Sequence, residues 1–255
     1  MKISVCMITF NNERTVERAL ESVRTWADEI IVVDSFSTDA TPKIVKNYTD
    51  NFEKRKWPGH RDQYNYCISK ARNEWIVFID ADEVIPKELA AEMLKRPEGD
   101  EGKYDGYIAH RRTFYLGRWI MHGGWIPDHE IRLFKKGRGA FEGALHAKAV
   151  VKGEVGVFKN YYQHFNYRDL ADQIATINRY SDIAARDMFN EGKKINIIDH
   201  LILRPPLRFL RDYVLKRGFL DGIPGLVIAI SSMYYVFTKY AKLWELEKML
   251  KKENT

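Results

Sequence analysis

Three carboxylates follow one apolar run of the chain within four positions. The run at residues 75–79 has the composition of a buried strand, and Asp80, Asp82 and Glu83 come directly after it. On an extended backbone Asp80 and Asp82 point to the same side, where like charges repel each other. A divalent cation that prefers oxygen ligands, Mg²⁺ or Mn²⁺, would relieve this repulsion and commonly binds together with a diphosphate. The alternative is a solvated turn in which Asp82 or Glu83 caps a helix that Pro86 begins.

The elements that would position these carboxylates alternate along the first 80 residues. The spacing of apolar residues predicts a strand at 2–10, a helix at 15–26, a strand at 29–35, helices at 37–48 and 62–72, and a strand at 75–80. Strands separated by helices predict right-handed βαβ units and therefore a doubly wound parallel sheet of the α/β class. Ligands bind at the carboxyl ends of the strands in such sheets, so Asn11, Asp34 and Asp80 are expected at one common edge.

The pattern changes after residue 100, where short aromatic-rich stretches of β type are separated by glycines. These stretches predict a mixed or antiparallel half that packs against the parallel sheet. Residues 169–192 have the spacing of a long helix that ends at Gly192. We therefore expect three parts, with residues 1–100 as the ligand-binding half of the main domain, residues 101–192 as its second half, and residues 193–255 as a helical extension.

The C-terminal extension carries the whole net positive charge of the chain. Residues 193–255 hold twelve Lys or Arg and six Asp or Glu, whereas the first 192 residues hold 29 of each sign. Residues 222–238 are uncharged, but they are fewer than the roughly 20 that span a bilayer, and Pro224 and Gly225 interrupt them. Basic flanks around an apolar stretch favour an interfacial or re-entrant contact with an anionic membrane surface. The alternatives are a helical hairpin packed against the protein or a dimer partner and, least favoured, a transmembrane helix.

Composition and the cysteines indicate the environment of the protein. The chain has 45% hydrophobic and 30% charged residues, as globular proteins do. The first ten residues alternate like a strand and lack the cleavage site of a secretory signal, which favours the cytoplasm. Cys6 and Cys67 have no metal-ligand spacing and are expected as reduced, buried thiols.

Four stretches in the first third of the chain resemble one known family in their order and spacing. They are SVCMITFNNE (4–13), VVDSFSTDAT (32–41), Gln63-Tyr64-Asn65 and WIVFIDADE (75–83). The chain thus resembles the family 2 glycosyltransferases, which have the GT-A fold. Further on, GGWIPDHEIRLFKK and FEGALHAK resemble a bacterial branch that includes lipopolysaccharide-core β-glucosyltransferases. The resemblance implies transfer of a hexose from a nucleotide-diphosphate sugar, with UDP as the expected nucleotide, inversion at the anomeric carbon, and Mg²⁺ or Mn²⁺ as cofactor.

The resemblance also implies roles for individual side chains. The residues expected to bind the nucleotide sugar are Thr9, Asn11, Glu13, Asp34, Arg61, Gln63, Asn65 and Asp80. Among these, Asp34 would face the base and ribose, and Asp80 would meet the ribose or a metal-bound water. The expected metal ligands are Asp82, which would coordinate directly, Asp80, and His146, for which His164 is the competitor.

Inverting transfer requires one further group, because a carboxylate must take the proton of the acceptor hydroxyl as it attacks opposite the leaving nucleotide. Asp128 in WIPDHEIRLF lies in a turn before a predicted strand, at the usual position of the base in the family, and is the expected catalytic base. Glu130 is the alternative. The expected acceptor is a glycan or a lipid-linked glycan, such as lipopolysaccharide core, at the inner face of the cytoplasmic membrane.

Two other classes of protein compete with this interpretation. FIDADEV fits the nucleophile motif of haloacid-dehalogenase-type phosphatases, but that motif normally lies on the first strand of its domain, and here strands and helices precede it. A membrane-surface module with a degenerate transferase domain would explain the basic extension, although all the carboxylates that the reaction needs are present. Nucleic acid is not an expected partner, because the uncharged stretch at 222–238 suits lipid better than phosphates.

Overall fold

A computed structural model describes residues 1–95, 102–143 and 147–253, with side chains described up to residue 249. The chain divides into two compact units. The first contains residues 1–113 and 128–165, and the second contains residues 114–127 and those from 166 onward. Residues 114–127 thus group with the C-terminal helices, so this division differs from the boundaries expected at residues 100 and 192. The roles expected for the three parts stay predictions.

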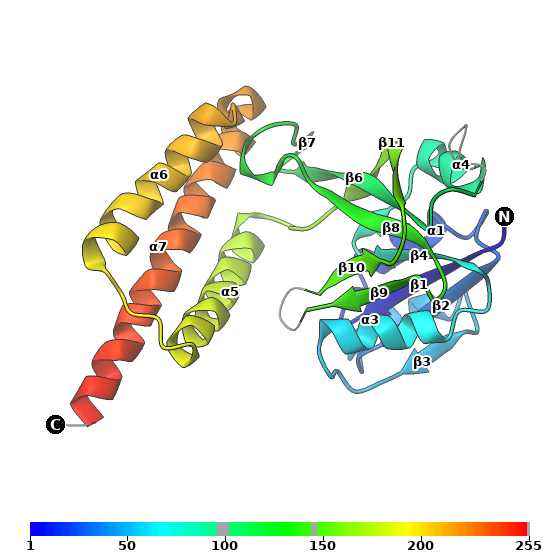
Figure 1. The fold of residues 1–255 in the computed structure, drawn as a ribbon, viewed down its shortest axis with the longest axis horizontal. Helices are drawn as coiled ribbons and strands as arrows, with labels where there is room; N and C mark the ends of the chain where they lie inside the picture. Colours follow the sequence, from blue (N-terminus) through cyan, green and yellow to red (C-terminus); the bar gives the residue numbers. More distant parts are fainter. Residues whose placement is uncertain (96–101, 144–146, 254–255) are drawn as a thin grey trace. The chain divides into compact units, whose positions relative to one another are not determined.

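The strands of the first unit form a mixed sheet. Their order is β3 (Phe52–Lys54), β2 (Glu29–Asp34), β1 (Ile3–Thr9), β4 (Trp75–Asp80), β8 (His129–Lys135), β6 (Gly106–Tyr115), β11 (Val155–His164) and β5 (Glu83–Val84) (Figure 1). The first four are parallel, whereas β8 is antiparallel to both of its neighbours. A separate hairpin consists of β9 (Gly139–Glu142) and β10 (Lys148–Val151). The predicted α/β class, with a parallel half followed by a mixed half, is confirmed.

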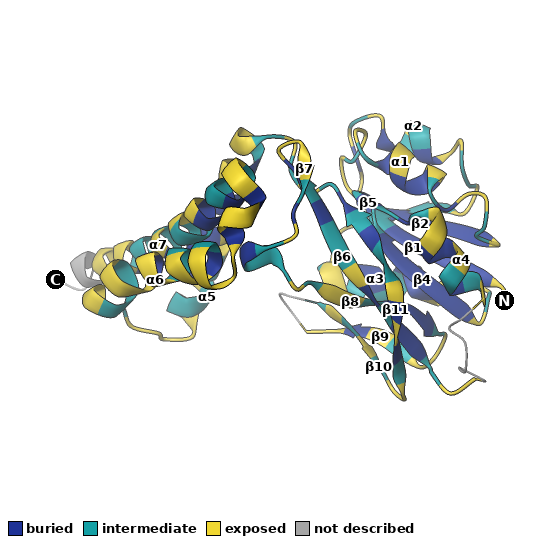
Figure 2. Ribbon diagram, turned by 90° about the horizontal axis from the view of Figure 1, so that it is seen from above, coloured by how far each residue is buried: buried dark blue, intermediate teal, exposed yellow. Residues whose placement is uncertain are grey.

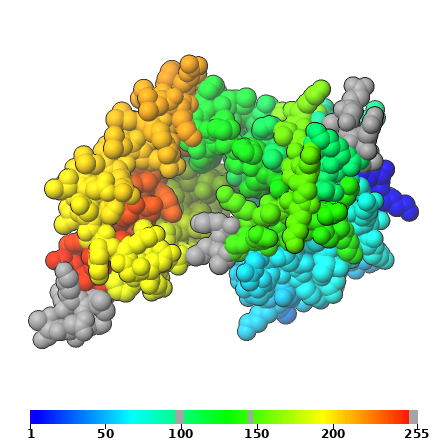
Figure 3. Space-filling view, viewed as in Figure 1, coloured from blue at the N-terminus to red at the C-terminus, as the bar shows by residue number. Residues whose placement is uncertain are grey.

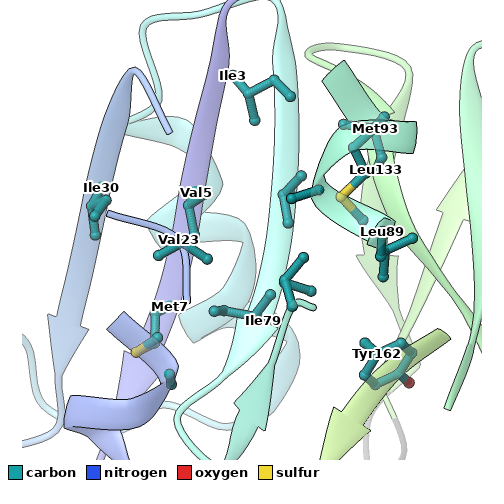
Figure 4. Packing of buried hydrophobic residues seen from close by; sticks show 14 of the residues in the cluster. Ile3, Val5, Met7, Val23, Ile30, Ile79, Leu89, Met93, Leu133 and Tyr162 are labelled. Atoms are coloured by element: carbon teal, nitrogen blue, oxygen red, sulfur yellow. The ribbon is translucent and has the colours of Figure 1, made fainter. Parts of the chain in front are cut away.

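Helices cover both faces of this sheet. They are α1 (Val16–Glu21), α2 (Thr41–Val45), α3 (His60–Ser69) and α4 (Lys87–Lys95). Because alternate residues of a strand face opposite sides, Ile79 packs in the cluster of α1, α2 and α4 (Figure 4), whereas Phe78 packs in the cluster of α3. The central strands are therefore buried on both faces (Figure 2), as parallel strands usually are. Cys6 and Cys67 lie in the α3 cluster as free, buried thiols, as predicted.

The strand register brings the ends of the first strands to one edge. Thr9 lies opposite Asp34 in the β1–β2 pair, and Ile8 lies opposite Asp80 in the β1–β4 pair. Asn11 follows two residues after the end of β1. The carboxyl ends of these three strands therefore meet at the edge where α/β proteins bind their ligands.

A buried carboxylate joins the opposite ends of the same strands. Glu29, at the start of β2, accepts hydrogen bonds from the Ser4 hydroxyl of β1 (2.5 Å) and from the backbone N–H of Arg72, shortly before β4 (2.9 Å). The guanidinium of Arg72 donates to it as well (2.5 Å). Burial alone would raise the pKa of Glu29, but the hydrogen bonds from Ser4 and Arg72 outweigh burial and hold this pKa below its usual value.

We expect Glu29→Gln to destabilise the protein by about 2 kcal/mol at neutral pH, because hydrogen bonds to a charged group are lost. A carboxyl with a lower pKa in the folded state stabilises the fold above the unfolded pKa, and this contribution disappears as the pH falls through the folded pKa. Urea unfolding should therefore show a difference in the free energy of unfolding between the unchanged protein and Glu29→Gln, and this difference should shrink below about pH 4. A difference that stays constant down to low pH would assign the effect to packing.

Helices make up most of the second unit. They are α5 (Leu170–Asn190), the π-helical η2 (Ile198–Leu203), α6 (Arg204–Leu210), the π-helical η3 (Arg211–Leu215), the 3₁₀ turn η4 (Gly218–Asp221) and α7 (Gly222–Glu253). The predicted helix at 169–192 is α5, which Asp169 caps by accepting from the backbone N–H of Asp172 (2.9 Å). Ala185 of α5 and Val236 of α7 share a buried cluster.

The C-terminal helix extends beyond the uncharged stretch that the sequence shows. The segment Gly218–Met249 is the one helix among the described residues that is long and apolar enough to cross a membrane, judged by length and composition only. Of its most apolar window, 28% is buried inside the protein. Core helices of soluble proteins pass the same test, but they are mostly buried. Much apolar surface of this helix thus remains exposed.

The loop at residues 116–127 contains β7 (Arg118–Trp119) and η1 (Gly123–Trp125) and belongs to the second unit. Hydrogen bonds to the C-terminal helices of that unit fix its conformation. The Asp221 carboxylate is fully buried and accepts hydrogen bonds from the backbone N–H groups of Met121 (3.0 Å) and His122 (2.7 Å). The N–H of Gly123 donates to the backbone carbonyl of Lys216 (2.9 Å). The conformation of this loop therefore depends on residues that lie far along the chain.

Candidate active site

A buried aspartate organises the loop that follows β2. The Asp34 carboxylate accepts hydrogen bonds from the Thr9 hydroxyl (2.9 Å) and from the backbone N–H of Ser37 (2.8 Å), and it is fully buried. The Ser37 hydroxyl donates to Oδ1 of Asp34 as well (2.5 Å). Both carboxylate oxygens are thus engaged by donors of the protein itself. The predicted contact of Asp34 with a base and ribose stays a prediction.

Two exposed side chains connect the loops that follow β1 and β2. Asn11 has a φ of 53°, in the left-handed region that asparagine tolerates, and its Oδ1 accepts from the backbone N–H of Thr38 (2.9 Å). The carboxylate of Glu13 accepts from the backbone N–H of Ala40 (2.9 Å). Because both side chains are exposed, they remain accessible to a ligand at the carboxyl edge of the sheet.

The three residues predicted on α3 differ in their surroundings. Gln63 is fully buried and donates to the Ser35 hydroxyl (3.1 Å). The side-chain amide of Asn65 donates to the carbonyl of Phe141 (2.9 Å) and accepts from its N–H (2.8 Å), which connects α3 to β9. Arg61 is exposed and pairs with the neighbouring aspartate (2.8 Å). Gln63 and Asn65 therefore hold the local structure together, whereas Arg61 is open to solvent.

The three carboxylates at the end of β4 differ in burial, because Glu83 is buried whereas Asp80 and Asp82 are half-buried. Glu83 is fully buried, accepts from the backbone N–H of Asp80 (2.9 Å) and pairs with the buried Arg132 (2.6 Å). The Asp80 carboxylate accepts from the Tyr64 hydroxyl (3.2 Å). Burial raises the pKa of Asp80, and the charge of Arg132 opposes this rise. Burial likewise raises the pKa of Glu83 to about 8, despite Arg132.

Asp82 lies beside a histidine of β11. Nε2 of His164 is 3.4 Å from Oδ2 of Asp82, and its Nδ1 is 3.4 Å from the Thr113 hydroxyl. Burial lowers the pKa of His164, but the hydrogen bond and the charge of Asp82 outweigh burial and raise this pKa. His146, the other predicted ligand, lies outside the described residues. Within the described ranges, no group of three or more His, Cys, Asp or Glu side chains could hold a metal ion.

The two predicted bases are each paired with an arginine. Arg111 of β6 donates from Nε to Asp128 (2.7 Å), and Arg132 donates to Glu130 (2.7 Å). The side chains of Asp128 and Glu130 are 26% and 49% exposed, so solvent reaches both of them. Two accessible carboxylates that are held by cations therefore stand at the start of β8.

One cavity of about 410 Å³ is lined by Asp80 and by both predicted bases, Asp128 and Glu130, whereas Asp82 and Glu83 lie outside its wall. Polar residues in its wall are Tyr64, Asp80, Asp128, His129, Glu130, Arg132 and Lys148. Among the described residues, those predicted on the loops after β1 and β2 lie outside this wall. The sequence interpretation missed Tyr64, Arg132 and Lys148 as site residues. The spacing of two between Glu130 and Arg132, which puts both on one face of a strand, was the available signal for the arginine.

The arrangement of the strands and helices is that of the GT-A glycosyltransferases. The mannosyltransferase PcManGT from Pyrobaculum calidifontis, solved in complex with GDP-Man and Mn²⁺, resembles the chain with a TM-score of 0.50 and 14% identity. The likeness covers 95% of this chain and 87% of that one. At this identity it concerns the fold, and it agrees with the GT-A fold expected from the sequence.

The chain belongs to the family described as Glycosyl transferase family 2, whose pattern matches residues 4–163. The lipopolysaccharide core biosynthesis glycosyltransferase LpsC of Rhizobium meliloti is 28% identical over 96% of this chain and 93% of that protein. An uncharacterized glycosyltransferase of Rickettsia typhi is 30% identical over 96% of this chain and 87% of its own length. Membership of this family confirms the predicted class of enzyme and argues against the phosphatase interpretation. The roles of individual residues stay predictions.

We expect Asp34→Ala to destabilise the protein by about 3 kcal/mol, because the Thr9 hydroxyl and the Ser37 N–H would be left buried without an acceptor. Asp50→Ala removes an exposed carboxylate and is the matched control, with an expected effect within about 0.5 kcal/mol. Urea unfolding followed by circular dichroism measures both variants. Equal free energies of unfolding for Asp34→Ala and Asp50→Ala would mean that the hydrogen bonds of Asp34 do not stabilise the loops after β1 and β2. That result would favour its predicted contact with the nucleotide.

Proposed function

We propose that this chain is a metal-dependent, inverting hexosyltransferase. Its donor is a nucleotide-diphosphate sugar, with UDP as the expected nucleotide, and its acceptor is a glycan or lipid-linked glycan such as lipopolysaccharide core. The observation that carries the proposal is the cavity that Asp80 shares with Asp128 and Glu130, within the part of the chain that matches the family. The name of the Rhizobium meliloti relative supports the class of acceptor.

The carboxylates of the acidic turn suit a divalent cation. Asp80 and Asp82 offer the hard oxygen ligands that Mg²⁺ and Mn²⁺ prefer, and His164 adjoins Asp82. The raised pKa of Asp80 is typical of a carboxylate whose charge the protein alone compensates poorly. Mg²⁺ commonly binds one or two carboxylates and completes its shell with water and substrate phosphates, which fits the small set of ligands described. When bound, such an ion would stabilise the charge of the departing diphosphate.

The nucleotide is proposed to lie along the carboxyl edge of β1 and β2. Asn11, Glu13 and Arg61 are exposed there and would contact it directly. Of the other predicted residues, Asp34 and Gln63 are buried behind this edge and would support it through their hydrogen bonds. Thr9 donates to Asp34, and Asn65 donates to the carbonyl of Phe141. Both would likewise support the edge through hydrogen bonds without contacting the nucleotide.

Transfer would proceed as a single displacement. The acceptor oxygen forms a bond to the anomeric carbon while the bond from that carbon to the diphosphate oxygen breaks, which inverts the configuration. Asp128 takes the proton of the acceptor hydroxyl, and Arg111 orients its carboxylate. Glu130, oriented by Arg132, is the alternative base.

The site of action is proposed to be the inner face of the cytoplasmic membrane, where a lipid-linked acceptor would be presented. The excess of positive charge in residues 193–255 and the exposed apolar side chains of the same region support a peripheral contact with that membrane. Pairing of two chains through the same exposed apolar side chains is the alternative use of this region.

Calorimetric titration of UDP, GDP and dTDP, with and without Mn²⁺, tests the donor site. We expect one nucleotide to bind about tenfold or more tightly with Mn²⁺, and we expect Asp82→Asn to remove this difference, because it removes a charged ligand. Asp50→Asn, which changes an exposed carboxylate, is the control and should bind like the unchanged protein. Failure of all three nucleotides to bind would contradict the proposal and favour a membrane-surface module with a degenerate transferase domain.

Asp128→Asn should keep metal-dependent nucleotide binding but lower the rate of sugar transfer about 10²- to 10⁴-fold, because the general base is lost. Release of the nucleotide from a nucleotide sugar, with water as the acceptor, provides an assay that needs no known glycan. Glu130→Gln is the matched variant and should retain most of the activity. If Glu130→Gln alone abolishes transfer, Glu130 is the base and the assignment to Asp128 is wrong.

A further inference from the structure

The helical segment at residues 197–215 exposes large apolar side chains along its length. It runs through η2, α6 and η3 without a break. Six of these side chains form what we call the apolar row, namely Ile198, Ile202, Leu203, Leu207, Leu210 and Val214, all between 49% and 65% exposed. Leu215 and Ile223 follow at 77% and 71%, the highest values among the large hydrophobic residues described. Figure 3 shows this segment, in yellow to orange, at the surface of the viewed face.

The spacing of the apolar row gives the segment two different sides. Apart from the neighbours Ile202 and Leu203, its members recur three or four positions apart, as residues on one side of a helix do. Pro205 and Asp212, which fall between them, are buried in the second unit. The segment therefore packs on one side and presents the apolar row to solvent, and an exposed apolar area of this length is typical of an interaction surface.

Cationic side chains border the apolar row. Arg208 and Arg211 fall between members of the apolar row, and both pair with the buried Asp212 (2.6 and 2.9 Å) while their side chains stay 35% and 47% exposed. Lys216 and Arg217 are exposed at the end of the segment, and neither pairs with a carboxylate in the part of the chain that the structure describes. An apolar surface bordered by cations is complementary to anionic head groups above acyl chains.

We propose that the apolar row and its cationic border form the surface by which this protein binds an anionic lipid bilayer. The apolar side chains enter the boundary between head groups and acyl chains, and the arginine and lysine side chains lie at the phosphates. The proposal rests on the proposed function only in that a lipid-linked acceptor explains why a glycosyltransferase would be held there. The contacts and exposures that carry it belong to the second unit alone.

The exposed side of α7 is the competing surface. Ile230, Tyr234, Phe237 and Trp244 are exposed on this helix. However, residues 222–238 carry no charge, so most of this side lacks the cations that an anionic surface requires. The charge pattern therefore favours the apolar row over α7 as the lipid contact.

Co-sedimentation with vesicles discriminates between the two surfaces. The full chain is expected to bind vesicles of phosphatidylcholine mixed with phosphatidylglycerol, but not vesicles of phosphatidylcholine alone. The double variant Leu207→Glu with Leu210→Glu should bind the mixed vesicles about tenfold or more weakly, because charges would enter the apolar boundary. Ile230→Glu with Phe237→Glu, on α7, is the control at similar exposure and should bind normally.

The cationic border is tested by Lys216→Gln with Arg217→Gln, which should weaken binding about fivefold for each charge removed at low salt. Equal binding to both kinds of vesicle, or loss of binding in the α7 variant alone, would overturn the proposal. A dimer that the Leu207 and Leu210 changes dissociate without lipid would assign the surface to a second copy of the chain. Circular dichroism and nucleotide titration of each variant show whether the fold and the donor site are intact, so failure here is distinguishable from failure of the proposed function.

Discussion

The guanidinium of Arg132, buried among carboxylates, connects three strands around the candidate site. It donates to Glu83 of β5 (2.6 Å), to Glu130 on its own strand β8 (2.7 Å) and to the Tyr162 hydroxyl of β11 (2.8 Å). Removal of one partner from such a buried pair commonly costs about 3–5 kcal/mol, because the remaining charge is left uncompensated. Glu83 also accepts from the N–H of Asp80, so the position of the acidic turn depends on an arginine 49 positions later in the chain.

This ion pair also decides which negative charges remain available at the site. Glu83 is buried and pairs with Arg132, and Asp128 pairs with Arg111. Asp80 and Asp82 are therefore the carboxylates of the turn with no lysine or arginine bonded to them among the described residues, although His164 lies beside Asp82. A cation proposed for this turn would therefore meet Asp80 and Asp82, the two carboxylates that the sequence predicts as its ligands.

Local patterns predicted the first half of the fold, whereas distant partners could not be predicted. The apolar runs at 29–35 and 75–80 form central strands. They could be predicted because a continuous apolar run indicates a buried strand without any knowledge of its neighbours in the fold. The partner of Asn65, by contrast, is the backbone of Phe141, 76 positions away, so no pattern around Asn65 could reveal its structural task. Arg132 was missed in part for a similar reason, because arginine is rarely buried and one of its two acidic partners, Glu83, lies 49 positions earlier in the chain.

The hydrogen bonds of Asp221 determine how this protein can be divided by experiment. The backbone N–H groups of Met121, His122 and Gly123 donate to acceptors on Asp221 and Lys216. The conformation of the loop at residues 116–127 therefore depends on the presence of the C-terminal helices. A chain shortened after α5 would leave these three donors without acceptors in a loop that ends directly before Asp128. Such a shortened enzyme would lose order beside the candidate base whether or not lipid is present. Truncation therefore cannot separate the proposed membrane binding from the proposed catalysis, whereas substitutions on the exposed helix surface can.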